Sequence, residues 1–195
     1  FPAFLDLSAQ QSLLRDVKNI LTRAPVFTPV MPRSGKPFSV SMSNCGSLGW
    51  VSDKRGYRYQ ELHPETNASW PAIPATLLNL WRQVTGYPGD PDACLINLYR
   101  GDARMGLHQD RDEIDFSAPV ISVSLGDSAR FRIGTDERRG KTSSLVLHSG
   151  DVMVLTGASR LAYHGIDRIL VGSSDMVGDA IPPFRRINLT LRRAR

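Results

Sequence analysis

Hydrophobic residues recur at helical spacing in two stretches of the first half of the chain. Ser8 begins a capping-box pattern, and the apolar residues after it predict an amphipathic helix over 9–23. Pro74 is suited to the first position of a helix, and the pattern after it predicts a second helix over 74–85. Each predicted helix has one apolar side.

Two segments between these helices favour strands instead. Residues 38–45 alternate between apolar and polar side chains, which predicts a strand. Residues 46–62 are rich in glycine, aromatic residues and arginine, which predicts a loop-and-hairpin region. The first part of the chain, 1–91, is therefore expected to contain helices, loops and a hairpin.

From residue 92 onward the pattern changes to the period of strands, and turn residues interrupt it at short intervals. No pattern of helix length intervenes. This texture is typical of a sandwich or a barrel. The second part, 92–195, is therefore expected to be all-β, with strands in the segments DACLINLYR, APVISVSLG, ARFRIG, SSLVLHSG, DVMVLTG, RLAYHG and RRINLTLRR.

Composition narrows the class of protein. Hydrophobic residues make up 41% and charged residues 22%, as in an ordinary globular protein, and no apolar run is long enough to span a bilayer. Cys45 and Cys94 match neither a metal motif nor a disulfide framework, and no signal peptide is visible, so a reducing cytoplasm is expected. The net charge of +5 favours an anionic partner, of which nucleic acid is the commonest.

The segment LHQDRDE (107–113) contains the pair His108-x-Asp110, and a further histidine, His164, follows in RLAYHG. A single such pair is weak evidence, because surface loops often carry one by chance. Two histidines and one carboxylate together form a facial ligand set that leaves positions on iron open. If the pair lies on a strand, both side chains point to the same side, as two ligands of one metal require.

The last predicted strand adds polar groups that could bind an anion. Alternation places Arg186, Asn188, Thr190 and Arg192 on one face. The two arginines could grip the two carboxylates of an elongated dianion, since a guanidinium binds carboxylate in bidentate fashion. In DACLINLYR, Asn97 and Tyr99 likewise share a face.

These motifs together resemble the AlkB-type 2-oxoglutarate dioxygenases, the nucleic-acid dealkylases. The resemblance extends from about residue 38 to 193, in the order of the family's motifs. Arg111 stands where a lysine is usual, and the 134–143 hairpin differs in detail. Besides the residues above, the resemblance is carried by NCGSLGW (44–50), GYRY (56–59), PDACLINLY (91–99), LHQDRDE and SRLAYHG (159–165).

The resemblance implies a mainly β fold with flanking helices. Its core would be a double-stranded β-helix, a jelly roll, over 92–195, and 1–91 would form helices and a nucleotide-recognition lid packed on that core as one structural unit. It implies Fe(II), bound by His108, Asp110 and His164, with 2-oxoglutarate and O2 as co-substrates. The 2-oxoglutarate would be held by Arg186, Tyr99 and Asn188 at its distal end and by Arg192 and Asn97 near the iron, with Thr190 on the same face.

The implied activity is oxidative demethylation of N-alkylated bases, such as 1-methyladenine and 3-methylcytosine, with release of formaldehyde, succinate and CO2. The implied partner is alkylated DNA, single- or double-stranded, with RNA as an alternative, and the chain is expected to act as a monomer. Trp50 would stack on a flipped base opposite His108, and Asp112 would accept from its exocyclic amine. The other substrate-binding residues would be Met42, Tyr57, Tyr59, Arg111, Glu113, Arg138 and Arg160.

Three other functions remain open at this point. The same iron chemistry could act on an RNA, a protein side chain or a lipid. A nucleic-acid-binding jelly roll without catalysis would not explain two arginines inside a barrel. A zinc hydrolase could use the same ligands, but it would leave Arg186 and Arg192 without a role.

Overall fold

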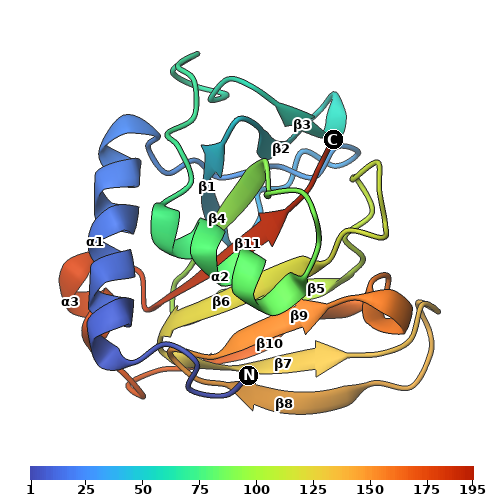
Figure 1. Cartoon of the computed structure of the whole chain (residues 1–195). Coiled ribbons are helices and arrows are strands. Elements are labelled where there is room, and N and C mark those ends of the chain that lie inside the picture. The colour runs from blue at the N-terminus through green and yellow to red at the C-terminus, as the bar shows by residue number, and fades with distance from the viewer.

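The computed structural model describes all 195 residues (Figure 1). Its elements run in the order α1 (Leu7–Arg23), β1 (Ser41–Gly46), β2 (Gly49–Asp53), β3 (Gly56–Gln60), α2 (Ala75–Thr85), β4 (Ala93–Tyr99), β5 (Met105–His108), β6 (Val120–Gly126), β7 (Ser128–Ile133), β8 (Ser143–Leu147), β9 (Val152–Leu155), the short 3-10 helix η1 (Gly157–Ser159), β10 (His164–Leu170), α3 (Met176–Ala180) and β11 (Arg186–Arg192).

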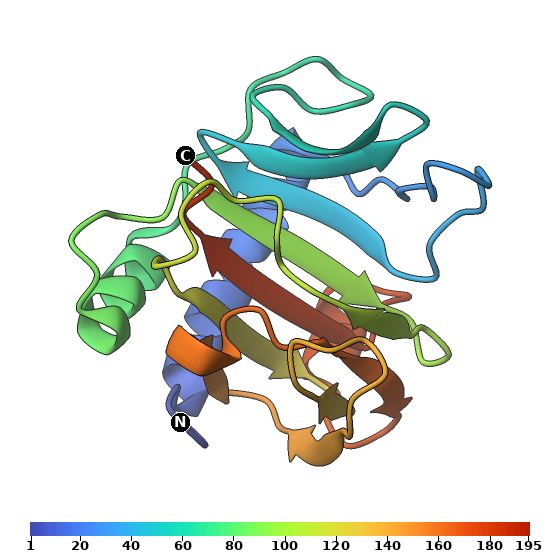
Figure 2. The same ribbon diagram turned by 90° about the vertical axis from the view of Figure 1, so that its right-hand side faces the viewer.

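Two antiparallel sheets face each other and confirm the expected jelly roll. The main sheet has the strand order β1-β4-β11-β6-β9, and the smaller sheet has the order β5-β10-β7-β8. The hairpin β2–β3 lies beyond β1 at one edge of the main sheet (Figure 2). Because β1 pairs with β4, the main sheet contains strands from both predicted parts of the chain.

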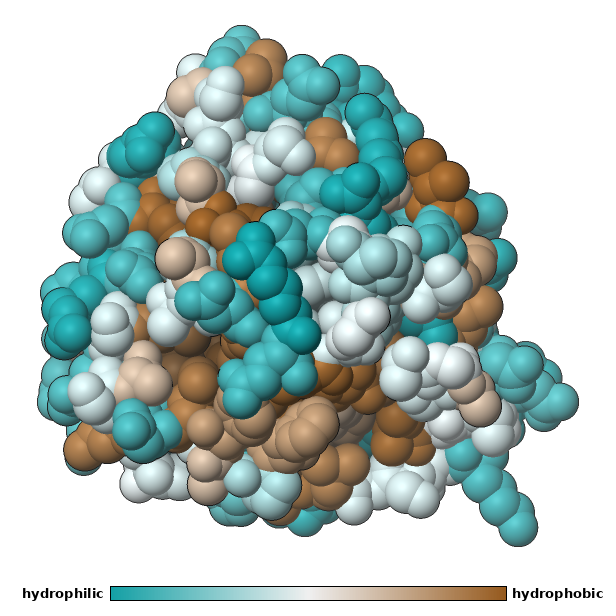
Figure 3. All heavy atoms as spheres, in the orientation of Figure 1, coloured by the Kyte–Doolittle hydropathy of each residue, from teal (hydrophilic) through white to brown (hydrophobic).

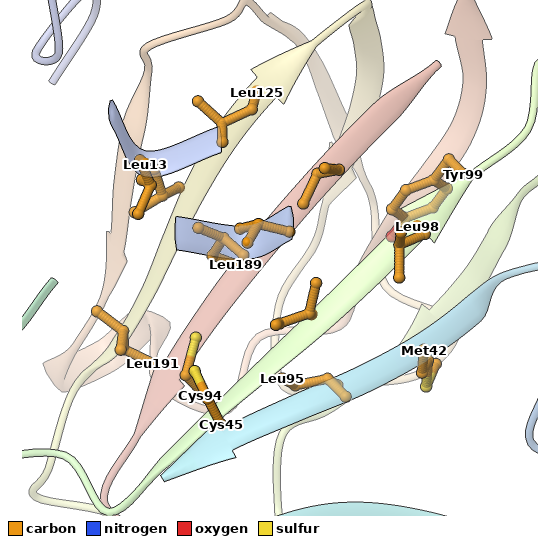
Figure 4. Close-up of a cluster of buried hydrophobic side chains, with 14 of the residues drawn as sticks. Leu13, Met42, Cys45, Cys94, Leu95, Leu98, Tyr99, Leu125, Leu189 and Leu191 are labelled. Atoms are coloured by element: carbon orange, nitrogen blue, oxygen red, sulfur yellow. The ribbon is translucent and has the colours of Figure 1, made fainter. Parts of the chain in front are cut away.

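Helices α1 and α2 cover the face of the main sheet that is turned away from the smaller sheet (Figures 1 and 2). Side chains from α1, β1, β4, β6 and β11 meet in this core (Figure 4). The alternation in β11 sends Leu189 and Leu191, both fully buried, into it. The polar residues of the same strand consequently face the space between the two sheets, as predicted.

The predicted helices are confirmed, with two corrections. Asp6 and not Ser8 caps α1, because its carboxylate accepts a hydrogen bond from the main-chain N–H of Ala9 at 2.8 Å. Pro74 is the N-cap of α2 and not its first helical residue. Gly86 ends α2 in the left-handed conformation with φ 62°.

Three further corrections concern two strands and one short helix. The predicted strand over 38–45 begins at Ser41. His164 begins β10 and does not end a strand. The helix α3, within the part expected to be all-β, was missed because five residues are too few for a helical pattern. The hairpin prediction is confirmed, with Trp50 and Tyr59 as cross-strand partners.

On the face of the molecule shown in Figure 1, hydrophilic side chains predominate, with hydrophobic ones exposed between them towards the centre and lower part (Figure 3). None of the helices has the length and apolar character that crossing a membrane requires.

Candidate metal centre and co-substrate cavity

Three potential metal ligands meet where β5 and β10 pair. His108 ends β5, His164 begins β10, and these two residues are partners in the register of the smaller sheet. Asp110 lies two residues beyond the end of β5, so strand alternation does not place its side chain as predicted. The loop after β5 instead turns the Asp110 carboxylate towards both histidines.

The three side chains present a compact donor set. Their ligand atoms all lie within 4.8 Å of one another. The Nε2 atoms of His108 and His164 lie 3.8 and 3.7 Å from the carboxylate oxygens of Asp110. Each Nδ1 lies 2.9 Å from a main-chain carbonyl, of Gly106 and Ala162 respectively. Those bonds fix the ring orientation and leave both Nε2 atoms available to a metal.

Asp110 is buried but remains ionised. Burial opposes its ionisation, yet the neighbouring groups, above all the positive charge of Arg192, outweigh it and hold the pKa of Asp110 well below its usual range. Arg192 makes the direct contact, since its Nη2 donates to Asp110 Oδ1 at 2.6 Å. Burial lowers the pKa of His164, so this ring is a neutral ligand at pH 7.

A cavity of about 660 Å³ extends from these residues between the sheets. In the register of β4 and β11, Asn188 is opposite Asn97 and Arg186 is opposite Tyr99, so their polar side chains share one face. The predicted face is therefore confirmed. Its members Asn97, Tyr99, Asn188, Thr190 and Arg192 line the cavity.

Arg186 is fully buried and lacks an anionic partner. Its guanidinium donates to three neutral oxygens, those of the main chain at Asp127 and Leu147 and the hydroxyl of Ser124. Burial lowers the pKa of Arg186 to about 10, so the side chain is still a cation at pH 7. A buried cation without a carboxylate is costly, which makes this position suited to a carboxylate supplied by a ligand. The Tyr99 hydroxyl beside it stays protonated, because burial raises its pKa to about 12.

The unpartnered atoms of the interior test whether iron and 2-oxoglutarate fit. Four buried side-chain atoms lack a hydrogen-bond partner: Asn97 Oδ1, Asp110 Oδ2, Arg186 Nε and Arg192 Nε. All four belong to the residues that sequence analysis assigned to the metal or the co-substrate. Buried polar atoms are normally satisfied, so their clustering here indicates a site that binds a polar ligand. The residues present thus fit a metal ion and a dianion.

The rim of the cavity carries aromatic and acidic side chains. The ring of Trp50 stacks on that of Tyr57, with centroids 5.6 Å apart and planes inclined by 17°. Its indole N–H donates to Asp112 at 2.8 Å. These three residues and the buried Met42 line the cavity, as the sequence predicted.

Three residues predicted to contact nucleic acid are instead buried and bonded to one another. The Tyr59 hydroxyl donates to Glu113 at 2.5 Å, and Arg160 donates to the other oxygen of Glu113 at 3.1 Å. None of the three exposes more than 9% of its surface. Other protein groups occupy the polar atoms of Tyr59, Glu113 and Arg160, and of the three only Glu113 lines the cavity, so their contact with nucleic acid stays a prediction.

Arg111 and Arg138 are exposed at the cavity, and neither forms an ion pair. The loop over 31–38 is a part of the cavity that the sequence did not predict, and its Met31, Pro37 and Phe38 line the cavity. The exposed Arg33 and Lys36 at its tip were the available signal.

Comparison with known proteins agrees with this geometry. Residues 1–192 match the family described as the 2OG-Fe(II) oxygenase superfamily. The chain is 55% identical, over its whole length and 86% of the relative, to the "Alpha-ketoglutarate-dependent dioxygenase AlkB homolog" of Caulobacter vibrioides. It is 42% identical to "Alpha-ketoglutarate-dependent dioxygenase AlkB" of Escherichia coli (strain K12), over 96% of this chain and 86% of that protein.

The fold has a solved counterpart as well. The structure of OsALKBH1 superimposes with a TM-score of 0.79 at 31% identity, covering 98% of this chain and 94% of that one. The metal ligands, the unpartnered arginine and these matches lead to one conclusion: this chain belongs to the 2OG-Fe(II) oxygenase superfamily, and within it to the AlkB-type dioxygenases.

Proposed function

We propose that this dioxygenase removes alkyl groups oxidatively from nucleic-acid bases, such as 1-methyladenine and 3-methylcytosine in DNA, and so reverses alkylation damage directly. The products are formaldehyde, succinate, CO2 and the restored base. Iron, together with 2-oxoglutarate and O2, supplies the oxidation of the N-alkyl group. The protein binds and orients the reactants and keeps water away from them.

The assignment of residues follows from the cavity and from the buried Arg186, which does not itself line the cavity but is opposite the lining residue Tyr99 in the register of β4 and β11. His108, Asp110 and His164 hold the iron. Arg186 binds the distal carboxylate of 2-oxoglutarate, because it is a buried cation without an anion, and the protonated Tyr99 donates a hydrogen bond beside it. The polar groups of Asn97, Asn188, Thr190 and Arg192 line the remaining path to the metal.

One observation supports a nucleobase most strongly: the same cavity reaches from the metal ligands to Trp50, Tyr57 and Asp112. An alkylated base must leave its stack to reach an enzyme's reactive centre, and a flipped base is held by aromatic faces and by polar contacts at its edge. Trp50 offers the aromatic face and Asp112 a carboxylate. A carboxylate also favours the positive charge that 1-methyladenine and 3-methylcytosine carry.

Basic side chains around the rim support a polyanionic substrate. Arg33, Lys36, Arg104, Arg111 and Arg138 are exposed, and no carboxylate pairs with any of them. The arginines of the hairpin are less available than the sequence indicated, because Asp53 binds Arg58 through two hydrogen bonds of 2.9 Å and also pairs with Arg55. The phosphate contacts are therefore assigned to the 31–38 loop and to the segments around Arg104, Arg111 and Arg138.

A formaldehyde-release assay tests this function. The full chain is supplied with Fe(II) and 2-oxoglutarate and offered oligonucleotides with a single 1-methyladenine or 3-methylcytosine. Unmethylated oligonucleotides and a methyl-lysine peptide serve as controls. We expect formaldehyde from the methylated oligonucleotides alone. Release from the peptide but not from either oligonucleotide would refute the proposal, and DNA and RNA versions of each strand decide which nucleic acid is preferred.

A further inference from the structure

A buried cluster of charged side chains surrounds Asp110. It contains Asp110, Glu113, Arg160 and Arg192, with the phenol of Tyr59 between them. Arg192 donates to Asp110, Arg160 donates to Glu113, and Tyr59 donates to Glu113. No member exposes more than 9% of its surface. Groups of this kind are rarely buried unless they are paired, so the cluster is a specific structure and not a chance contact.

The charges within the cluster balance. Two carboxylates face two guanidiniums, and the Tyr59 hydroxyl stays protonated because burial raises its pKa. Although burial opposes it, the contacts with Asp110, Tyr59 and Glu113 raise the pKa of Arg192. The charge of Arg192 is thus compensated by the protein, in contrast to that of Arg186. The formal charges of the cluster therefore balance without a ligand, while Asp110 Oδ2 and Arg192 Nε remain without a hydrogen-bond partner.

Glu113 connects to Asp110 through both arginines. Its Oε2 accepts from Arg160, and the Nη1 of Arg160 donates to the main-chain carbonyl of Asp110 at 2.7 Å. Its Oε1 lies 3.6 Å from Arg192 Nε, and Arg192 holds the Asp110 side chain. Loss of the charge on Glu113 would leave Arg160 without a carboxylate partner and Arg192 with Asp110 alone. The position of the Asp110 carboxylate would then be less constrained.

Tyr59 joins this cluster to the hairpin. It lies on β3, its ring packs with Leu48, Ala93 and Ala194, and its hydroxyl accepts from Arg192 Nη1 at 3.3 Å while donating to Glu113. Its cross-strand partner is Trp50, which donates to Asp112.

The cross-strand pair of Trp50 and Tyr59 in the hairpin is therefore hydrogen-bonded to the consecutive residues Asp112 and Glu113, which closely follow Asp110.

We propose that Glu113, Arg160 and Tyr59 are positioning residues that hold Asp110 and Arg192 in the arrangement that binds metal and co-substrate. Through Tyr59 this arrangement depends on the docking of the β2–β3 hairpin. The proposal rests on the proposed metal site. It is tested by metal and co-substrate binding, which does not require the substrate to be a nucleic acid.

The first experiment measures Co(II) binding to the metal-free protein by calorimetry, in the wild type, Glu113→Gln, Tyr59→Phe and Tyr87→Phe. Tyr87→Phe is the matched control, because Tyr87 donates a hydrogen bond of 2.7 Å to Asp115, a carboxylate outside the cluster. We expect Glu113→Gln to weaken Co(II) binding by about 10- to 100-fold, as loss of a group that supports a metal ligand does. We expect a smaller loss for Tyr59→Phe and none for Tyr87→Phe.

A second readout separates displacement of Asp110 and Arg192 from the mere loss of a negative charge. Loss of the charge alone would weaken binding of the cation and leave binding of the anion unchanged or tighter, whereas displaced Asp110 and Arg192 side chains would bind both ligands less well. The affinity for 2-oxoglutarate, measured without O2 at saturating Co(II), should therefore fall as well. Unchanged Co(II) binding, or 2-oxoglutarate binding that is unchanged or tighter, would overturn the proposal. If Glu113→Gln does not fold, Arg160→Lys is measured in the same way, because it retains the charge and loses the forked contact to Glu113 and the Asp110 carbonyl.

The dependence on the hairpin is tested by amide hydrogen exchange. If the two regions are coupled, metal binding must stabilise the hairpin as much as hairpin docking stabilises the metal site. Co(II) should therefore slow exchange over residues 49–60 in the wild type and in Tyr87→Phe. The slowing should be absent in Tyr59→Phe. Equal slowing in all three proteins would show that Tyr59 does not couple the hairpin to the metal site.

Discussion

The buried end of the cavity and its rim use polar side chains in opposite ways. At the buried end, atoms of Asn97, Asp110 and Arg192 lack a partner, and Arg186, opposite the cavity-lining Tyr99, meets only neutral oxygens. At the rim, the indole of Trp50 is bonded to Asp112 and its ring is stacked on Tyr57. Polar groups at the buried end thus have bonding capacity that only a ligand can use. Those at the rim are paired with one another until a substrate replaces these contacts.

This difference has an energetic consequence. An unsatisfied buried group gains its full interaction when the ligand arrives, because no protein contact must be broken first. A base that enters the rim must replace the Trp50–Asp112 bond, so its net gain is smaller. Substitutions at the buried end should therefore have much larger effects than substitutions at the rim.

The largest effect is expected at the metal ligands. His108→Ala, Asp110→Ala and His164→Ala should each abolish turnover, since the facial set needs all three donors. Formaldehyde release and anaerobic Fe(II) binding would be measured side by side. A variant that keeps near-full activity without an added ligand would remove that residue from the metal site.

The second largest effect is expected at Arg186. Removing one partner of a buried charge pair costs about 2–5 kcal/mol, so Arg186→Ala should raise the KM for 2-oxoglutarate at least roughly thirtyfold. The KM for the methylated oligonucleotide should change little. Arg186→Lys keeps the charge but loses the forked guanidinium, so its KM for 2-oxoglutarate should lie between those of the wild type and of Arg186→Ala. Equal increases in both KM values would make Arg186 a structural residue instead.

The buried end was also the part that the sequence predicted best. Alternation in a strand determines which residues share a face, so Arg186, Asn188, Thr190 and Arg192 could be placed from spacing alone. The histidines could be identified from their residue types and motif. Asp110 was assigned correctly to the ligand set. The prediction relied on strand alternation, but Asp110 lies in the loop after β5.

The charged cluster could not be predicted in this way. Glu113 bonds to Tyr59, which is 54 positions away, and to Arg160, which is 47 positions away. Nothing in the local pattern distinguishes these residues from an exposed acidic turn or a solvated arginine. Their burial depends on how the hairpin and the loop before β10 pack together, which is a property of the tertiary structure.

An intermediate effect is expected at Trp50. Stacking of a base on an aromatic ring contributes about 1–3 kcal/mol, so Trp50→Ala should weaken oligonucleotide binding by that amount. Trp50→Phe keeps a stacking face but loses the N–H that occupies Asp112, and it should retain most of the affinity. Consumption of 2-oxoglutarate without substrate should persist in both variants. Unchanged affinity in Trp50→Ala would contradict a stacking role.

The smallest effect is expected from single basic residues at the rim. There, the salt dependence of oligonucleotide affinity distinguishes unpaired basic side chains from those already paired with a carboxylate. Removal of one phosphate contact lowers the slope of log affinity against log salt concentration by about 1. We expect this for Arg33→Ala and Lys36→Ala, because both residues are exposed and unpaired. Arg58→Ala should leave the slope nearly unchanged, since Asp53 already holds that guanidinium.

Arg15→Ala provides the matched control, as an exposed arginine on α1, which covers the face of the main sheet away from the cavity. Affinity for a methylated oligonucleotide would be measured from low to physiological salt in all four variants. If Arg15→Ala lowers the slope as much as Lys36→Ala, the charge acts over the whole surface. If Arg58→Ala has the largest effect, the hairpin and not the 31–38 loop contacts the phosphates, and the Arg58–Asp53 pair must open when nucleic acid binds.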